Sequence, residues 1–99
     1  MVETPAGWPF QDPPNVAVFT VTRIVKLGHP ILFVRHDEED GAWQFHDGGP
    51  AASADAMLVS LAYMLKRDPS LAQLADLPLG WQAPRDSATG PWKREKVAE

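Results

Sequence analysis

The sequence contains, at residues 31–46, the stretch ILFVRHDEEDGAWQFH, which has the pattern of a β-hairpin. Two runs rich in β-branched and aromatic residues, 31–37 and 42–46, flank the acidic segment Glu38-Glu39-Asp40-Gly41. Such residues favour strands, and an Asp-Gly pair between two such runs is a strong turn signal. The stretch therefore predicts two antiparallel strands joined by a short turn.

The hairpin also predicts which side chains share a face of the sheet. With a turn of two or four residues, paired positions have numbers that add to an odd value, and side chains alternate along each strand. One face then carries an apolar set with one histidine: Leu32, Val34, His36, Trp43 and Phe45. The other face carries the more polar set: Phe33, Arg35, Asp37, Gln44 and His46. A three-residue loop would reverse this assignment, because a slip of one residue turns a strand over.

Two further strands lie outside the hairpin. Residues 16–22 are rich in β-branched side chains, and residues 79–83 alternate apolar with polar or small ones, so both predict strands. Thr22 is expected to cap a short helical turn through Leu27, which Gly28 would end.

Two helices are expected after Pro50. Residues 53–67 predict a helix with Ser53 as its N-cap, because Leu58, Leu61, Ala62 and Leu65 follow i, i+3, i+4, i+7 spacing. The pair Asp68-Pro69 predicts the start of a second helix over residues 69–76. These elements predict an α+β fold, with a small antiparallel sheet of about four strands and two helices packed on one face.

The chain divides into an arm, one domain and a tail. Residues 1–15 contain prolines at positions 5, 9, 13 and 14, and predict an extended N-terminal arm. Residues 16–92 form the single α+β domain, and the charged residues 93–99 predict a flexible tail. Trp8 and Phe10 in the arm either pack back onto the domain or dock a partner protein, and the sequence leaves both readings open.

The composition is that of a globular chain with an acidic balance. Of the 99 residues, 44% are hydrophobic and 22% are charged, and the net charge is -4. A nucleic-acid binder normally presents a basic stripe, whereas the basic cluster at residues 93–96 is short and interrupted by Glu95. We therefore expect no nucleic-acid partner.

The absence of cysteine and the first residues of the chain indicate the cellular compartment in which we expect the protein. The absence of cysteine excludes disulfides, thiolate metal sites and thiol catalysis, and it fits a cytoplasmic location. The first residues lack the basic start and apolar stretch of a signal peptide. No apolar run approaches the ~20 residues that a membrane helix needs, so we expect no membrane partner.

The sequence predicts no catalytic, cofactor or metal site. His36 and His46 are expected on opposite faces, so they cannot share one ion, and the chain has no HExxH pair. The acidic turn lacks the alternating ligands of a calcium loop. Residues 48–50 lack the length and the lysine of a phosphate loop, and no GxSxG elbow is present. We therefore expect a protein that is not an enzyme.

Several short motifs between Val18 and Trp92 resemble a known family. They are Thr20-x-Thr22-Arg23, Pro30-Ile31-Leu32, the run from His36 through Gly41-Ala42-Trp43-Gln44-Phe45, Asp68-Pro69-Ser70-Leu71 and Leu77-Pro78-Leu79-Gly80-Trp81. This pattern, over about three-quarters of the chain, resembles small bacterial domains related to the immunity proteins of polymorphic toxin systems. The resemblance implies neutralisation of a partner by binding rather than catalysis, and it carries no catalytic motif.

The polar face of the sheet is the candidate binding surface. Hydrophobicity assigns Phe19 and Val21 to the core with the apolar hairpin set, which the helix over 53–67 would cover. The reverse face and the acidic turn then supply the candidate binding residues: Thr20, Thr22, Phe33, Arg35, Asp37, Glu38, Glu39, Gln44 and His46. The alternative to a binding surface is an ordinary solvent-exposed face, which antiparallel sheets commonly have.

Two classes of function remain. The first is a protein-binding module with a toxin-like or regulatory partner. The second is a small ligand-binding or enzymatic domain that uses His46 and Arg35.

Overall fold

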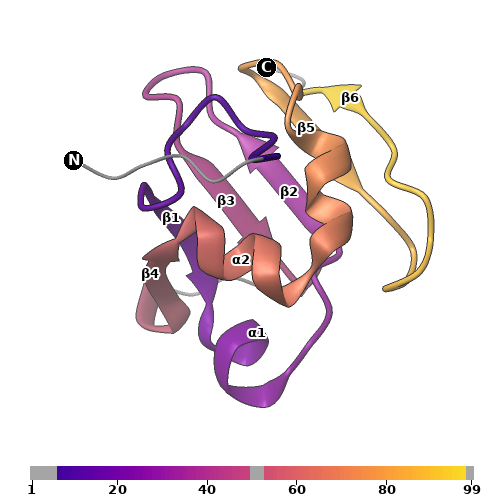
Figure 1. Cartoon of the computed structure of the whole chain (residues 1–99). Coiled ribbons are helices and arrows are strands. Elements are labelled where there is room, and N and C mark those ends of the chain that lie inside the picture. Colours follow the sequence, from indigo (N-terminus) through magenta and orange to yellow (C-terminus); the bar gives the residue numbers. More distant parts are fainter. Residues whose placement is uncertain (1–6, 50–52, 98–99) are drawn as a thin grey trace.

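A mixed sheet of six strands forms the centre of the part of the chain that the computed structural model describes, residues 7–49 and 53–97. The strand order across the sheet is β4-β1-β3-β2-β5-β6 (Figure 1). The strands are β1 (Ala17–Val21), β2 (Phe33–His36), β3 (Trp43–His46), β4 (Ala56–Ser60), β5 (Trp81–Pro84) and β6 (Glu95–Lys96). The helical segments are α1 (Thr22–Leu27), the 3-10 turn η1 (Ser53–Asp55), α2 (Leu61–Arg67) and the 3-10 helix η2 (Pro69–Leu74). The α+β prediction is confirmed, but the sheet is larger than expected and is not purely antiparallel, because β1 pairs with β3 in parallel.

The predicted hairpin is confirmed as β2 and β3. Val34 lies opposite Phe45 and His36 lies opposite Trp43, so the pairing has the odd sum that the sequence predicted. The Gly41 N–H donates to Asp37 O at 3.0 Å and closes the turn. His36 and His46 consequently point to opposite faces. His36 stacks on Trp43 at 3.9 Å between ring centroids, on the core side.

The predicted helix over residues 53–67 is wrong in its first half. Ala56–Ser60 forms strand β4, which pairs with β1 along all five residues. Helix α2 begins only after Ser60, whose Oγ accepts a hydrogen bond from Tyr63 N at 3.1 Å. The sequence Ala-Met-Leu-Val-Ser suits either a helix or a strand, so pairing with β1 overrides its local preference. The second predicted helix is also shorter, because the 3-10 helix η2 ends at Leu74.

The face assignment on β1 is wrong for Phe19 and Thr20, whereas Val21 is buried in the core as predicted. Val18 and Thr20 point into the core, where both are buried, while Phe19 lies on the opposite face with 42% of its surface exposed. Residues 17–21 are apolar except for one threonine, so their pattern does not distinguish the two faces. The pairing register of β1 with β3 and β4 determines which side chains of β1 face the core.

The core lies between the sheet and the segments that cross it. Helix α2 crosses one face of the sheet (Figure 1), and Leu61, Met64, Leu71 and Leu74 from α2 and η2 are buried there.

Phe10 also belongs to this core and meets Trp43 edge-to-face at 5.3 Å between centroids. Trp8 packs against the same cluster. The described part of the arm, residues 7–15, therefore packs back onto the domain, whereas residues 1–6 lie outside the described residues.

The C-terminal segment is not simply a tail. Glu95–Lys96 forms β6, which pairs with β5 through Gln82 opposite Glu95 and Trp81 opposite Lys96. Trp92 packs against the core and faces the Arg85 guanidinium at 3.9 Å. Part of the segment expected to be a flexible tail thus adds one short strand to the sheet, within the described residues up to 97.

Candidate functional site

The face of the sheet opposite α2 is the candidate site, and we call it the open face. The strand registers align one residue from each strand in a single row across it. In order, the row consists of Leu58, Phe19, Gln44, Arg35, Gln82 and Glu95. The row changes from apolar at β4 to polar and charged at β6. A mixed row of this kind offers apolar area together with directional contacts.

A chain of polar contacts links four side chains of the open face. Arg35 Nε lies 3.0 Å from Asp37 Oδ1, an ion pair without hydrogen-bond geometry. Asp37 Oδ2 accepts a hydrogen bond from Gln44 Nε2 at 2.7 Å. Gln44 Oε1 lies 3.0 Å from His46 Nε2. Because the Asp37 carboxylate only accepts, it orients the Gln44 amide so that Oε1 faces His46.

The direction of these bonds sets the state of His46. Its Nε2 must carry a proton to donate to Gln44 Oε1. Burial lowers the pKa of His46 below its ordinary value, against a smaller opposing effect of Asp47. At neutral pH the side chain is therefore neutral, with the proton on Nε2. Phe33 lies beside it, with ring centroids 6.0 Å apart.

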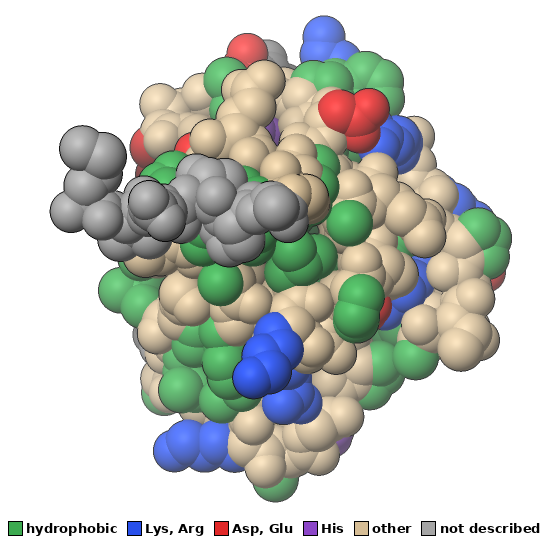
Figure 2. Space-filling model, in the orientation of Figure 1, with side chains coloured by type: hydrophobic (Ala, Val, Ile, Leu, Met, Phe, Trp, Pro, Cys, Tyr) green, Lys and Arg blue, Asp and Glu red, His purple; other side chains and the backbone are tan. Residues whose placement is uncertain are grey.

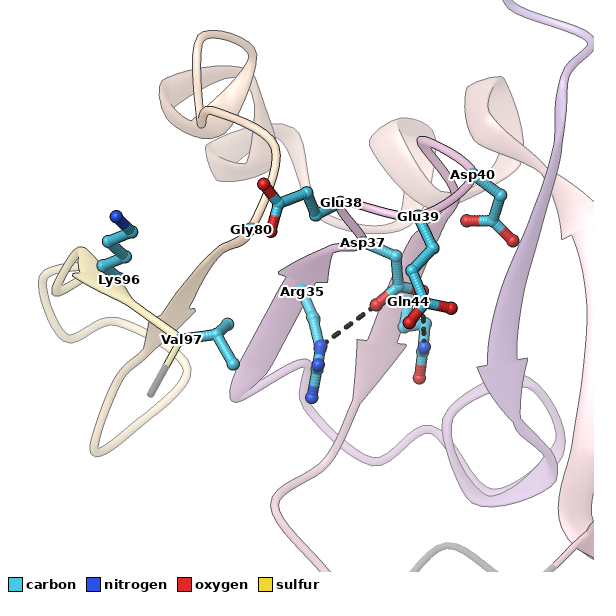
Figure 3. A pocket seen from close by; sticks show the side chains of 9 residues that line it. All are labelled: Arg35, Asp37, Glu38, Glu39, Asp40, Gln44, Gly80, Lys96 and Val97. Atoms are coloured by element: carbon cyan, nitrogen blue, oxygen red, sulfur yellow. Dashed lines mark hydrogen bonds and ion pairs between the residues drawn. The ribbon is translucent and has the colours of Figure 1, made fainter. Parts of the chain in front are cut away.

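A wide hollow separates the acidic turn from β6. It encloses about 1110 Å³, and Figure 3 shows the Arg35 side chain between Val97 of the C-terminal segment and the acidic turn. Four carboxylates, from Asp37, Glu38, Glu39 and Asp40, line it against the two cations of Arg35 and Lys96. The excess of negative charge favours a basic ligand surface over an acidic one.

A second, smaller hollow lies on the other side of Arg35 and Gln44, which line both. It encloses about 570 Å³ beside Phe33, His46 and Pro84. Arg85 also lines it, but its guanidinium is engaged in the interior: Nε donates to Ile31 O at 2.9 Å and Nη2 to Asp68 Oδ2 at 2.5 Å. Arg35 is the more exposed cation: its Nε lies 3.0 Å from Asp37 Oδ1, and 43% of its side chain is exposed.

The structure brings most of the predicted site residues together and separates two of them. Phe33, Arg35, Asp37, Gln44 and His46 lie on or beside the open face, and Glu38 and Glu39 lie on the rim of the larger hollow. Thr20 instead points into the core, with 1% of its surface exposed. Thr22 is the first residue of α1 and not its cap, because Val21 holds the N-cap position.

Four open-face residues were not among the predicted binding residues: Phe19, Leu58, Gln82 and Glu95. Phe19 and Leu58 are 42% and 62% exposed, which is unusual for large apolar side chains. Their strands lack a polar-apolar contrast, so no local signal could have assigned their face. The alternation of Trp81, Gln82 and Ala83 in the predicted last strand did contain the signal for Gln82.

The opposite side of the molecule has a different character. Figure 2 shows the side that α2 covers, where Lys and Arg side chains form separate groups among apolar ones. No group of three or more His, Asp or Glu side chains in the described ranges could hold a metal ion. No helix in the same ranges is long and apolar enough to cross a membrane.

Comparisons with known proteins identify no relative of this chain. No family model, curated protein or solved structure matches the chain. The resemblance to immunity proteins therefore stays a prediction from the short motifs, and the open face must be judged by its own chemistry.

Proposed function

We propose that this domain acts by binding another protein through the open face of its sheet, in the manner of an immunity protein that neutralises its partner. The observation that carries the proposal is the row of exposed and half-buried side chains across six strands, with two exposed large apolar residues at one end and Arg35 near its centre. Aromatic residues and arginine are enriched at protein interfaces, and Phe19 and Arg35 are of these types. Phe19 and Leu58 keep 42% and 62% of their surfaces exposed on this face.

Arg35 is the proposed central anchor. Arg35 lines both hollows and 43% of its side chain is exposed, so its guanidinium can form paired hydrogen bonds with a partner carboxylate. Asp37 and Gln44 hold the side chains around it in defined orientations. Less ordering is then needed when the partner binds.

The acidic turn is the proposed steering element. Glu38, Glu39 and Asp40 are exposed at the tip of the hairpin, and the whole chain has a net charge of -4. Exposed charges accelerate encounter with a partner of opposite charge more than they hold the complex together. We therefore propose a basic partner. The proposal assigns no catalytic residue and no cofactor, and it includes a cytoplasmic location.

The experiment begins with a tagged copy of the chain as bait in an extract of the source cells, followed by surface-plasmon kinetics with the purified partner. Arg35→Ala should mainly accelerate dissociation, by about thirtyfold for an anchor that contributes about 2 kcal/mol. Glu38→Gln with Glu39→Gln should mainly slow association and flatten its salt dependence. Lys66→Ala is the matched control, because it removes an exposed cation from α2 on the other side of the sheet. Folded variants that all bind like the wild type would refute the proposal.

The smaller hollow supports a second candidate function, the binding of a small aromatic or aliphatic carboxylate. It combines the Arg35 cation with the apolar surfaces of Phe33 and Pro84 and the neutral ring of His46. An NMR titration with benzoate and acetate would test it. Saturable shifts centred on Phe33 and His46 that disappear in Arg35→Ala would support this function, and shifts that are weak and scattered would refute it.

A further inference from the structure

The two edges of the sheet are built differently. The edge formed by β6 has two residues, Glu95 and Lys96, and both are charged. The edge formed by β4 has five residues, Ala56–Ser60, without a charged side chain or a proline. Short, charged edges resist pairing with other strands, whereas a longer uncharged edge is a template for it. Of the two edges, β6 alone has the features that keep a sheet from extending.

The backbone of β4 presents hydrogen-bonding groups to the outside. Leu61 N donates to Val16 O at 2.9 Å, just beyond the paired residues of β4 and β1. Because directly bonded pairs alternate along an antiparallel ladder, Val59 and Met57 direct their N–H and C=O groups toward β1. Those of Leu58 therefore point away from β1. No described residue pairs with them.

The exposed side chains of this edge are apolar. Leu58 is 62% exposed and lies opposite Phe19, which is 42% exposed, so the two form one apolar patch at the end of the open face. Isolated exposed leucines are common on protein surfaces, but a joined aromatic-aliphatic pair beside free backbone groups marks an interaction surface.

We propose that two copies of this chain pair through their β4 strands, antiparallel and about a two-fold axis at Leu58. In this register each Leu58 faces its counterpart, and Ala56 faces Ser60 of the second copy. The outward N–H and C=O of Leu58 bond across the axis, and two six-stranded sheets become one. The apolar patches of Leu58 and Phe19 meet on the same face.

A second copy fits this edge because the strand is complementary to itself. Each position of β4 faces an uncharged residue, so two chains of net charge -4 meet where neither contributes a charge. The nearest carboxylate at the start of the strand, Asp55, lies 3.7 Å from Arg23 Nη1 and is partly neutralised by it. An isologous contact of this kind closes as a dimer and leaves the β6 edges at the two ends.

The first test is the oligomeric state of the purified full-length chain by sedimentation velocity over a wide concentration range. The wild type should show a reversible dimer. Leu58→Lys should raise the dimer dissociation constant about tenfold or more, since it removes the apolar contact and places two like charges opposite each other. The matched control is Leu79→Lys, which changes a leucine that is 51% exposed outside β4 and should leave the dimer intact.

Amide hydrogen exchange provides a second readout that needs no substitution. The Leu58 N–H should exchange quickly in dilute solution and slowly at high concentration, whereas the Val59 N–H should be protected at both. A wild-type chain that stays monomeric would overturn the proposal. It would also be overturned if the dimer survives Leu58→Lys unchanged, or if the Leu58 amide exchanges equally fast in the dimer. All of these measurements use the chain alone, so they are independent of any other binding partner.

Discussion

Trp43 on β3 donates its indole N–H to Asp12 Oδ2 in the N-terminal arm, at 2.9 Å. Trp8 Nε1 donates to the Asp12 backbone oxygen at 2.8 Å, so Asp12 joins two tryptophans through its side chain and backbone. Phe10 lies between these contacts and is buried against Trp43. The described arm is thus held to the sheet by both apolar packing and hydrogen bonds.

This arrangement predicts that Asp12→Ala lowers the free energy of unfolding by about 1–2 kcal/mol, because the partly buried Trp43 indole loses its charged acceptor. Urea unfolding followed by tryptophan fluorescence measures the effect. Asp86→Ala, at a side chain that is 89% exposed, is the control and should change stability by less than about 0.5 kcal/mol. Equal effects of the two substitutions would contradict the prediction.

The boundary between β4 and α2 can be tested with two leucines three positions apart. Leu61 has no exposed surface, so Leu61→Ala should lower the free energy of unfolding by about 2–5 kcal/mol. Leu58 is 62% exposed, so Leu58→Ala should cost less than about 0.5 kcal/mol in dilute solution. A continuous helix with both residues on its core side would instead give two large losses. Chemical denaturation of both variants distinguishes the two arrangements.

Thr20 carries a buried hydroxyl with no hydrogen-bond partner among the described residues. Thr20→Val keeps the branched shape and removes the unsatisfied group, so it should raise the free energy of unfolding by about 1 kcal/mol. Thr22→Val at the start of α1 is the comparison and should gain less, because Thr22 is only half-buried. A destabilised Thr20→Val variant would show that the hydroxyl has a partner in solution.

The pKa of His46 should lie below its ordinary value of about 6.5, because the side chain is partly buried beside Phe33 and Gln44. Below the ordinary pKa the unfolded chain binds the proton more readily than the folded one. The His46 contribution to stability is therefore present above about pH 6.5 and is lost as the pH falls toward the lowered value. An NMR titration of the imidazole ring measures this pKa directly. A midpoint at or above 6.5 would contradict the assignment.

Asp47 should make the fold sensitive to acid. Its carboxylate accepts two hydrogen bonds from Arg23, at 2.6 and 2.9 Å, and these hold the pKa of Asp47 well below its usual range. A carboxylate with a depressed folded pKa stabilises the fold above its unfolded pKa, near 3.9, and loses that contribution as the pH falls further. Asp47→Asn should therefore be less stable than wild type at pH 7 and lose less stability on acidification below about pH 4. The free energies of unfolding of wild type and Asp47→Asn, measured with urea across this pH range, should converge as the pH falls. A constant difference between the two proteins would contradict the prediction.

The hairpin shows how much of the site could be predicted from sequence. Residues 43–46 alternate clearly between apolar and polar side chains, and the turn that joins them to the preceding strand is short. For a turn of two or four residues, this alternation predicts that Phe33, Arg35, Gln44 and His46 share one face, whereas a three-residue loop would reverse it. The strand pairing confirms this, and it also confirms that His36 and His46 lie on opposite faces.

What the sequence determined by itself is therefore the part of the fold with clear local patterns: the presence of the hairpin, the short helix ended by Gly28, and the burial of Trp43 and Leu61. The tertiary structure alone decided the face of Phe19 and the strand at residues 56–60. Both segments are nearly uniform in polarity, so their own residues fit two arrangements about equally well. Strand β1 lies between β3 and β4, and its backbone groups must be paired on both sides. This pairing makes residues 56–60 a strand, and its register places Phe19 on the open face.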